Sequence, residues 1–152
     1  MSLHPSSLFQ QPHHICIVVP DMAAAIQYYE SIGIGPWHDY PPLREYTELE
    51  MPNEAGFHAL VFKYCDLRGL QLQLCEPGVA DTPQRRFLES KGPGVFHVGF
   101  SVDHLNAAEQ AGKAAGLAPL MRGRRPDGSG FTYFDTADKA GVILEIRKAK
   151  SA

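Results

Sequence analysis

The sequence predicts an α+β fold that is built from two βαβββ modules. A short apolar strand followed by a helix occurs twice along the chain, and strand-like runs follow the helix both times. The 152 residues are close to the commonest size of one domain, and neither module alone would bury much apolar surface. We therefore expect a single domain, residues 1–152, with module one at about 12–77 and module two at about 95–148.

Clear local signals bound the first strand and the first helix. Residues 14–19 are apolar and largely β-branched, which favours a strand. Asp21 is a common type of helix N-cap, so a helix is expected over residues 22–31. Gly33 would end this helix, because glycine tolerates the backbone conformation that follows a helix C-terminus.

Module two repeats this pattern. A strand is expected at 96–102, followed by Asp103 as N-cap and by an alanine-rich helix at 104–115, which Gly116 would close. The remaining elements are expected as strands at 57–64, 70–75, 131–135 and 142–147, weaker strands near 45–48 and near Leu120, and a short helix at 83–90 in the connector between the modules.

The two modules align well enough to pair individual polar residues. The segment HHICIVVPDMAAA superposes on FHVGFSVDHLNAA, which places His14 on His97 with an offset of 97 − 14 = 83. The strands LQLQL and GVILEI place Gln73 on Glu145 with an offset of 145 − 73 = 72. Each of these residues alone would more often be an ordinary strand or surface residue. Two pairs at repeat-equivalent positions are hard to obtain by chance.

These four residues have the chemistry of a metal site. Each is a polar residue in an otherwise apolar strand, and a buried polar group without a partner is costly. Around one cation the four groups can satisfy one another. Two imidazoles, one amide oxygen and one carboxylate suit Co²⁺, Ni²⁺, Mn²⁺, Fe²⁺ or Zn²⁺. We predict that this divalent ion is bound by His14, Gln73, His97 and Glu145, with two coordination positions left for a substrate.

Charge and composition argue against a nucleic-acid-binding, membrane-spanning or disulfide-stabilised protein. The formal net charge of −3 gives no basis for nucleic-acid binding, and no stretch reaches the roughly 18 apolar residues that a membrane span needs. The first residues lack the features of a signal peptide, so a soluble cytoplasmic protein is expected. Cys16, Cys65 and Cys75 have no spacing typical of a disulfide framework or a zinc site, which predicts buried free thiols.

Four segments resemble the vicinal oxygen chelate superfamily, which includes glyoxalase I, bleomycin-resistance proteins and extradiol dioxygenases. They are HHICIVVPDMAAAIQYYE, LQLQLCEP, RRFLESKGPGVFHVGF and GVILEI, and the resemblance extends from His13 to about Arg147. The ligand order His, Gln, His, Glu is most similar to that of the methylmalonyl-CoA epimerase family. The resemblance implies that the two βαβββ modules form a cupped mixed sheet around a metal site.

The resemblance also implies a reaction and further site residues. In this family a chelated thioester is converted to an enolate, and two acid/base groups flank the carbon that loses its proton. One of these groups would be Glu145. The other would be Glu54 in the segment PNEAGF, with Glu50 as the alternative. The partners implied are a small-molecule substrate such as an acyl-CoA and a second copy of the chain in a homodimer.

Three other functions use the same fold and remain open. A glyoxalase I-like lyase relies on the same enolate chemistry. An extradiol-type dioxygenase binds Fe²⁺ through two histidines and one carboxylate, a set that His14, His97 and Glu145 could supply. A metal-free binding or resistance protein usually lacks the ligands. Five arginines could contact CoA phosphates, although a solvated surface is the commoner role: Arg85, Arg86, Arg122, Arg124 and Arg125.

Overall fold

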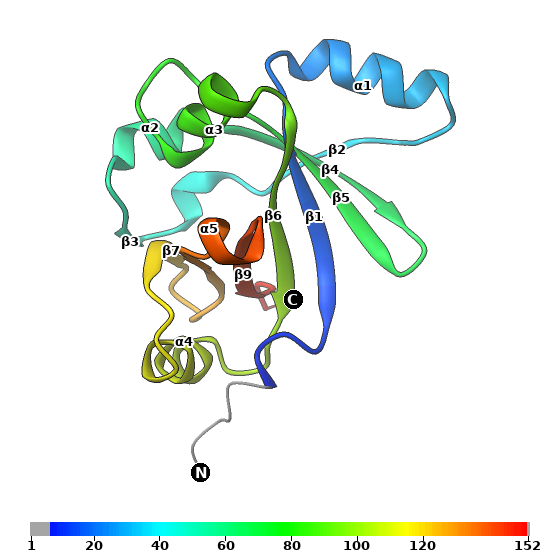
Figure 1. Ribbon diagram of the computed structural model, residues 1–152. Coiled ribbons are helices and arrows are strands. Elements are labelled where there is room, and N and C mark those ends of the chain that lie inside the picture. Colours follow the sequence, from blue (N-terminus) through cyan, green and yellow to red (C-terminus); the bar gives the residue numbers. More distant parts are fainter. Residues whose placement is uncertain (1–6, 152) are drawn as a thin grey trace. The chain divides into compact units, whose positions relative to one another are not determined.

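The computed structural model describes residues 7–151, and most of its elements are labelled in Figure 1. No helix within this range is long and apolar enough to cross a membrane. The strands are β1 (Pro12–Val18), β2 (His38–Asp39), β3 (Glu48–Glu50), β4 (Val61–Leu67), β5 (Leu70–Glu76), β6 (Gly94–Ser101), β7 (Pro119–Arg124), β8 (Gly130–Phe134) and β9 (Ile143–Lys148). The helices are α1 (Met22–Ser31), η2 (Leu43–Glu45, a 3₁₀ turn), α2 (Glu54–His58), α3 (Pro83–Lys91), α4 (Leu105–Ala114) and α5 (Ala137–Ala140).

The predicted α+β class with two βαβββ modules is confirmed. Module one consists of β1, α1, β2, β4 and β5, and module two of β6, α4, β7, β8 and β9. The chain folds into two compact units that largely follow these modules. Within the described residues, the module-one unit comprises 14–42 and 53–96, and the module-two unit comprises 7–13, 43–52 and 97–151.

In the module-one unit the strands are hydrogen-bonded in the order β2-β4-β5-β1, with β1 parallel to β5 and β4 antiparallel to it. Helix α1 begins where Asp21 accepts a hydrogen bond from the backbone N of Ala24 at 3.1 Å, as predicted for an N-cap. The apolar stripe of α1 packs on one face of the sheet around Val19, Met22 and Leu74. Because neighbouring side chains alternate, Gln73 points to the opposite face.

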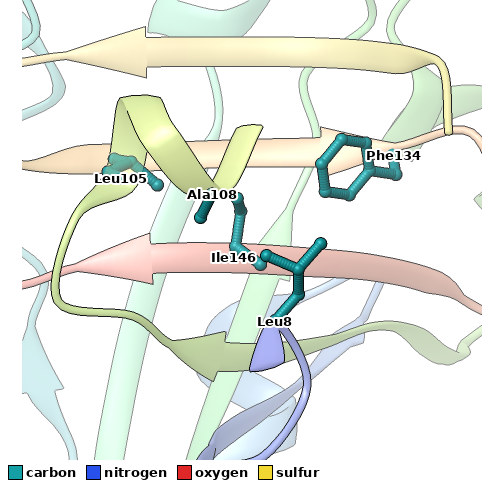
Figure 2. Close-up of a cluster of buried hydrophobic side chains, with 5 residues drawn as sticks. All are labelled: Leu8, Leu105, Ala108, Phe134 and Ile146. Carbon is teal, nitrogen blue, oxygen red and sulfur yellow. The ribbon is translucent and has the colours of Figure 1, made fainter. Parts of the chain in front are cut away.

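In the module-two unit the order is β6-β9-β8-β7-β3, with β6 parallel to β9 and the other pairs antiparallel. Figure 2 shows how Leu105 and Ala108 of α4 pack with Phe134 of β8, Ile146 of β9 and Leu8. All five side chains are buried. Since Ile146 points into this core, the preceding residue on β9 points to the other face of the sheet.

Two of the predicted strands differ from the structure. The strand predicted at 57–64 begins only at β4, because Asn53 accepts a hydrogen bond from the backbone N of Gly56 at 3.0 Å and starts α2. Local capping therefore overrides the β-like sequence around Phe57. The weak strand predicted near 45–48 is β3, and it pairs with β7 inside the module-two unit rather than with the strands of module one.

The N-cap predicted for α4 is also wrong by one residue. Asp103 precedes the helix, and His104 takes the N-cap position without a side-chain capping hydrogen bond. The other predicted helices and strands lie where the sequence places them, within a few residues at their ends, including α3 in the connector. The short elements β2, η2 and α5 were not predicted.

A buried carboxylate joins α4 to β7 and β8. Glu109 Oε1 accepts hydrogen bonds from Thr132 Oγ1 at 2.6 Å, Arg122 Nε at 2.7 Å and Arg124 Nη2 at 3.1 Å. Burial alone would raise the pKa of the Glu109 carboxyl, but these hydrogen bonds and the arginine charges lower it below its ordinary value. The solvated role considered for five arginines is therefore wrong for three of them, since Arg124 and Arg125 are buried and Arg122 is largely covered. It holds for Arg86 on α3, whose side chain is exposed.

Replacing Leu8 with alanine is expected to lower the free energy of unfolding by about 2–5 kcal/mol. Leu8 precedes the first strand, yet its side chain is only 1% exposed and lies in the core under α4. Urea unfolding would measure the loss, with the exposed Leu67→Ala as a control that should change stability by less than about 1 kcal/mol. Equal stability of the Leu8 variant and the unmutated protein would contradict this packing.

Candidate metal centre

The register of β1 and β5 positions the two candidate ligands of module one. These strands run in parallel, with His14 opposite Gln71 and Cys16 opposite Gln73. His14, Cys16 and Gln73 therefore point to one face of the sheet, as the alternation of strand side chains predicts. Both candidate ligands are buried, His14 at 2% and Gln73 at 4% exposure.

Module two repeats this register. The parallel strands β6 and β9 place His97 opposite Ile143 and Gly99 opposite Glu145. The carboxylate ligand therefore occupies the position, relative to its histidine, that the amide ligand occupies in module one. Both residues are buried, and His97 Nε2 lies 2.8 Å from Glu145 Oε2. The repeat inferred from the sequence is thus also a repeat in strand pairing.

Hydrogen bonds orient the amide of Gln73. Its Nε2 donates to Gln71 Oε1 at 2.8 Å, and Gln71 Nε2 donates to Asp66 Oδ1 at 3.0 Å. An amide nitrogen that donates in this way leaves the carbonyl oxygen as the end that can coordinate a cation. The arrangement therefore presents Gln73 in the form that a hard or borderline metal ion requires.

The donor set has the chemistry of a divalent-metal site. In each module a buried histidine is accompanied by a buried oxygen donor at the same register position, an amide in module one and a carboxylate in module two. Imidazole nitrogens together with amide and carboxylate oxygens suit divalent ions such as Co²⁺, Ni²⁺ or Zn²⁺. The chemistry of the residues present therefore fits a divalent ion.

Residues 13–134 match the model of the Glyoxalase/Bleomycin resistance protein/Dioxygenase superfamily. The chain belongs to this superfamily. The matched span includes His14, Gln73 and His97, whereas Glu145 lies on β9 beyond its end.

Several curated relatives are similar over nearly the whole chain. The uncharacterized protein YqjC of Bacillus subtilis is 29% identical over 140 residues, which cover 90% of this chain and 91% of that protein. Human mitochondrial methylmalonyl-CoA epimerase is 25% identical over 140 residues, which cover 90% of this chain and 73% of the human protein.

Solved structures have the same fold. The crystal structure of methylmalonyl-CoA epimerase from Mycobacterium tuberculosis matches with a TM-score of 0.70 and 21% identity, covering 96% of this chain and 92% of that one. A Streptomyces coelicolor methylmalonyl-CoA epimerase variant in complex with 2-nitronate-propionyl-CoA matches with a TM-score of 0.70 and 22% identity, covering 94% and 99%. These likenesses support the fold of this glyoxalase-superfamily member.

The two candidate bases lie in different surroundings. Glu54 is the first residue of α2, directly after its cap Asn53, and its side chain is exposed. Glu50 lies on β3 opposite Arg122, and its carboxylate is 3.8 Å from the Arg122 guanidinium. Arg122 also pairs with Glu109, so Glu50 belongs to a charge cluster of the module-two unit. Both carboxylates are exposed, so the two residues differ in their charged neighbours rather than in burial.

A pair of tyrosines was missed by the sequence analysis. Tyr133 on β8 lies opposite Glu145, and its ring packs against the His97 ring with centroids 4.7 Å apart. Tyr64 on β4 lies opposite Gln73 in the same way. A third repeat-equivalent pair thus accompanies the ligands. The difference in residue number between Tyr64 and Tyr133 is not the same as that between the equivalent ligands. An alignment of the ligand strands therefore does not place the two tyrosines on one another.

The three cysteines are buried thiols, as the sequence predicts. Burial, assisted by the charge of Glu76, strongly raises the pKa of the Cys75 thiol. Burial also raises the pKa of Cys65. Both thiols therefore stay protonated near neutral pH, which suits packing rather than metal coordination.

Proposed function

We propose that this protein is a divalent-metal-dependent enzyme that stabilises an enolate, an epimerase of the methylmalonyl-CoA epimerase type. The observation that carries the proposal is the buried donor set, in which His14 and Gln73 repeat the register of His97 and Glu145. The names of the relatives and the bound 2-nitronate-propionyl-CoA of one neighbour support an acyl-CoA substrate.

The four ligands would hold the ion and leave two of six positions to the substrate. A bound divalent ion would supply Lewis-acid stabilisation of the negative charge that develops on the substrate oxygen. The protein residues would do the remaining work. Burial of the ligands keeps water from the charge, and the Tyr133 ring beside His97 holds that imidazole in place.

Epimerisation needs one group that removes the α-proton and another that returns it on the opposite side. We assign these roles to Glu54 and Glu145. Glu145 is a ligand whose carboxylate has a second oxygen that can hold the proton. Glu54 is exposed at the start of α2, where a carboxylate can exchange its proton with water.

Glu54→Gln is expected to slow α-proton exchange by about 10²- to 10⁴-fold while Co²⁺ binding stays unchanged, because the amide cannot act as a base. Proton NMR of methylmalonyl-CoA in deuterated water would measure the exchange with the Co²⁺-loaded enzyme. Glu50→Gln is the matched control and should exchange at close to the normal rate. If Glu50→Gln lost exchange and Glu54→Gln kept it, the assigned base would be wrong.

One alternative has a specific observation in its favour. The buried residues His14, His97 and Glu145 supply two histidines and one carboxylate, which is also the iron-binding set of ring-cleaving dioxygenases. Incubation of the Fe²⁺-loaded protein with catechols in air, followed by ultraviolet absorption, would decide between the two. Iron-dependent ring cleavage without any α-proton exchange would replace the epimerase proposal.

A further inference from the structure

We propose that Gln71 is a positioning residue that determines which end of the Gln73 amide faces the metal ion. The inference rests on the proposed metal-dependent function and concerns a residue that would not itself bind the ion. It starts from a chain of two hydrogen bonds on β4 and β5, which runs from Asp66 through Gln71 to Gln73.

The strand register places these three side chains on one face of the sheet. Asp66 is paired with Gln71 across β4 and β5, and Gln71 and Gln73 are two residues apart on β5. Burial increases along this series of hydrogen bonds, since Asp66 is exposed, Gln71 is half-buried and Gln73 is buried. The hydrogen bonds therefore lead from solvent to Gln73, the candidate ligand of module one.

The direction of these hydrogen bonds is set at the exposed end. An ionised carboxylate only accepts hydrogen bonds, so Asp66 selects the NH₂ group of Gln71. The Gln71 carbonyl oxygen then faces Gln73 and selects its NH₂ group in turn. The carbonyl oxygen of Gln73 is left at the far end of the chain, where it can coordinate a cation. Turning this amide over would present hydrogen atoms to the ion instead.

Module two provides an internal comparison. Glu145 is the equivalent ligand there, and the residue two positions before it is Ile143, which stands opposite His97 as Gln71 stands opposite His14. A carboxylate has two equivalent oxygens and needs no partner to select one end. Gln71 is thus found in the module whose ligand is an amide, with one oxygen end and one nitrogen end. This is the module in which a residue that orients the ligand is expected.

The test measures Co²⁺ affinity by titration with Co²⁺ alone, followed in the visible spectrum. Gln71→Met keeps the length of the side chain but removes the acceptor, and it should weaken Co²⁺ binding about 10-fold or more. Gln71→Glu keeps an acceptor for Gln73 and should bind Co²⁺ at least as tightly as the unmutated protein. Asp66→Leu, at an exposed position, should weaken binding in the same direction but less. Arg68→Met, on the same hairpin, is the matched control.

A second background separates orientation from packing. In a Gln73→Glu protein the ligand is a carboxylate, so adding Gln71→Met should change Co²⁺ affinity by less than about 2-fold. Thermal unfolding of each metal-free variant would show that it is folded. Equal losses in both backgrounds, or no loss in either, would overturn the positioning role while leaving the metal site intact. Failure of the unmutated protein to bind Co²⁺ would overturn both this inference and the proposed function.

Discussion

Glu145→Ala is expected to abolish Co²⁺ binding and to slow α-proton exchange by about 10³-fold or more, because it removes a residue that is proposed to be both a ligand and an acid/base group. Its carboxylate is buried and lies 2.8 Å from His97 Nε2, so the variant also leaves that imidazole without its neighbour. Co²⁺ titration and exchange of methylmalonyl-CoA protons in deuterated water would measure the two losses separately.

A second substitution of Glu145 separates its proposed role as a ligand from its proposed role as an acid/base group. Glu145→Gln keeps one ligand oxygen but cannot hold the proton, so Co²⁺ should still bind, more weakly, while exchange is lost. Glu89→Ala, which removes an exposed glutamate paired with Arg85 on α3, is the control and should change neither property. Normal exchange by the Glu145→Gln protein would show that another group moves the proton.

A large loss of stability is expected when the buried carboxylate of Glu109 is removed. Glu109→Leu is expected to lower the free energy of unfolding by about 3–5 kcal/mol, because it leaves the Arg122 and Arg124 charges buried without their carboxylate. Urea unfolding would measure the loss. Lys113→Ala is the matched control, since Lys113 is exposed, lies 3.6 Å from the same carboxylate and should contribute less than about 1 kcal/mol.

The pH dependence of this difference has a definite sign. The pKa of Glu109 is lowered in the folded protein, so its stabilising contribution is present above the ordinary glutamate pKa of about 4.3 and is lost as the pH falls below it. The gap in stability between the unmutated protein and Glu109→Leu should therefore narrow on acidification. A gap that widens below this pH would contradict the role of the ionised carboxylate.

The sequence predicted the features that depend on alternation and repetition. Gln73 and Glu145 occupy equivalent positions in two similar strands, which the sequence alone indicates, and the structure repeats the same register in each module. Features that depend on long-range pairing could not be predicted. Strand β3 pairs with β7 of the other module, and Arg124 is buried because it meets Glu109, which lies 15 residues away on α4.

The proposed orienting role of Gln71 could not be predicted from the sequence either. In the sequence, Gln71 is simply a second polar residue in LQLQL, and its direction of hydrogen bonding depends on Asp66 across the hairpin. Likewise, the position of Glu54 follows from the local cap at Asn53, which starts a helix where the sequence favours a strand. Both features arise from side-chain hydrogen bonds that a periodic pattern does not encode.

The most direct test of a shared metal site is the Co²⁺ content of the unmutated protein and of the single variants His14→Ala and His97→Ala, measured by elemental analysis after loading and dialysis. One histidine comes from each module, and both are proposed to bind the same ion. The expected result is about one Co²⁺ per chain in the unmutated protein and less than about one tenth of that in each variant. No bound Co²⁺ in the unmutated protein, or full occupancy in either variant, would contradict the account.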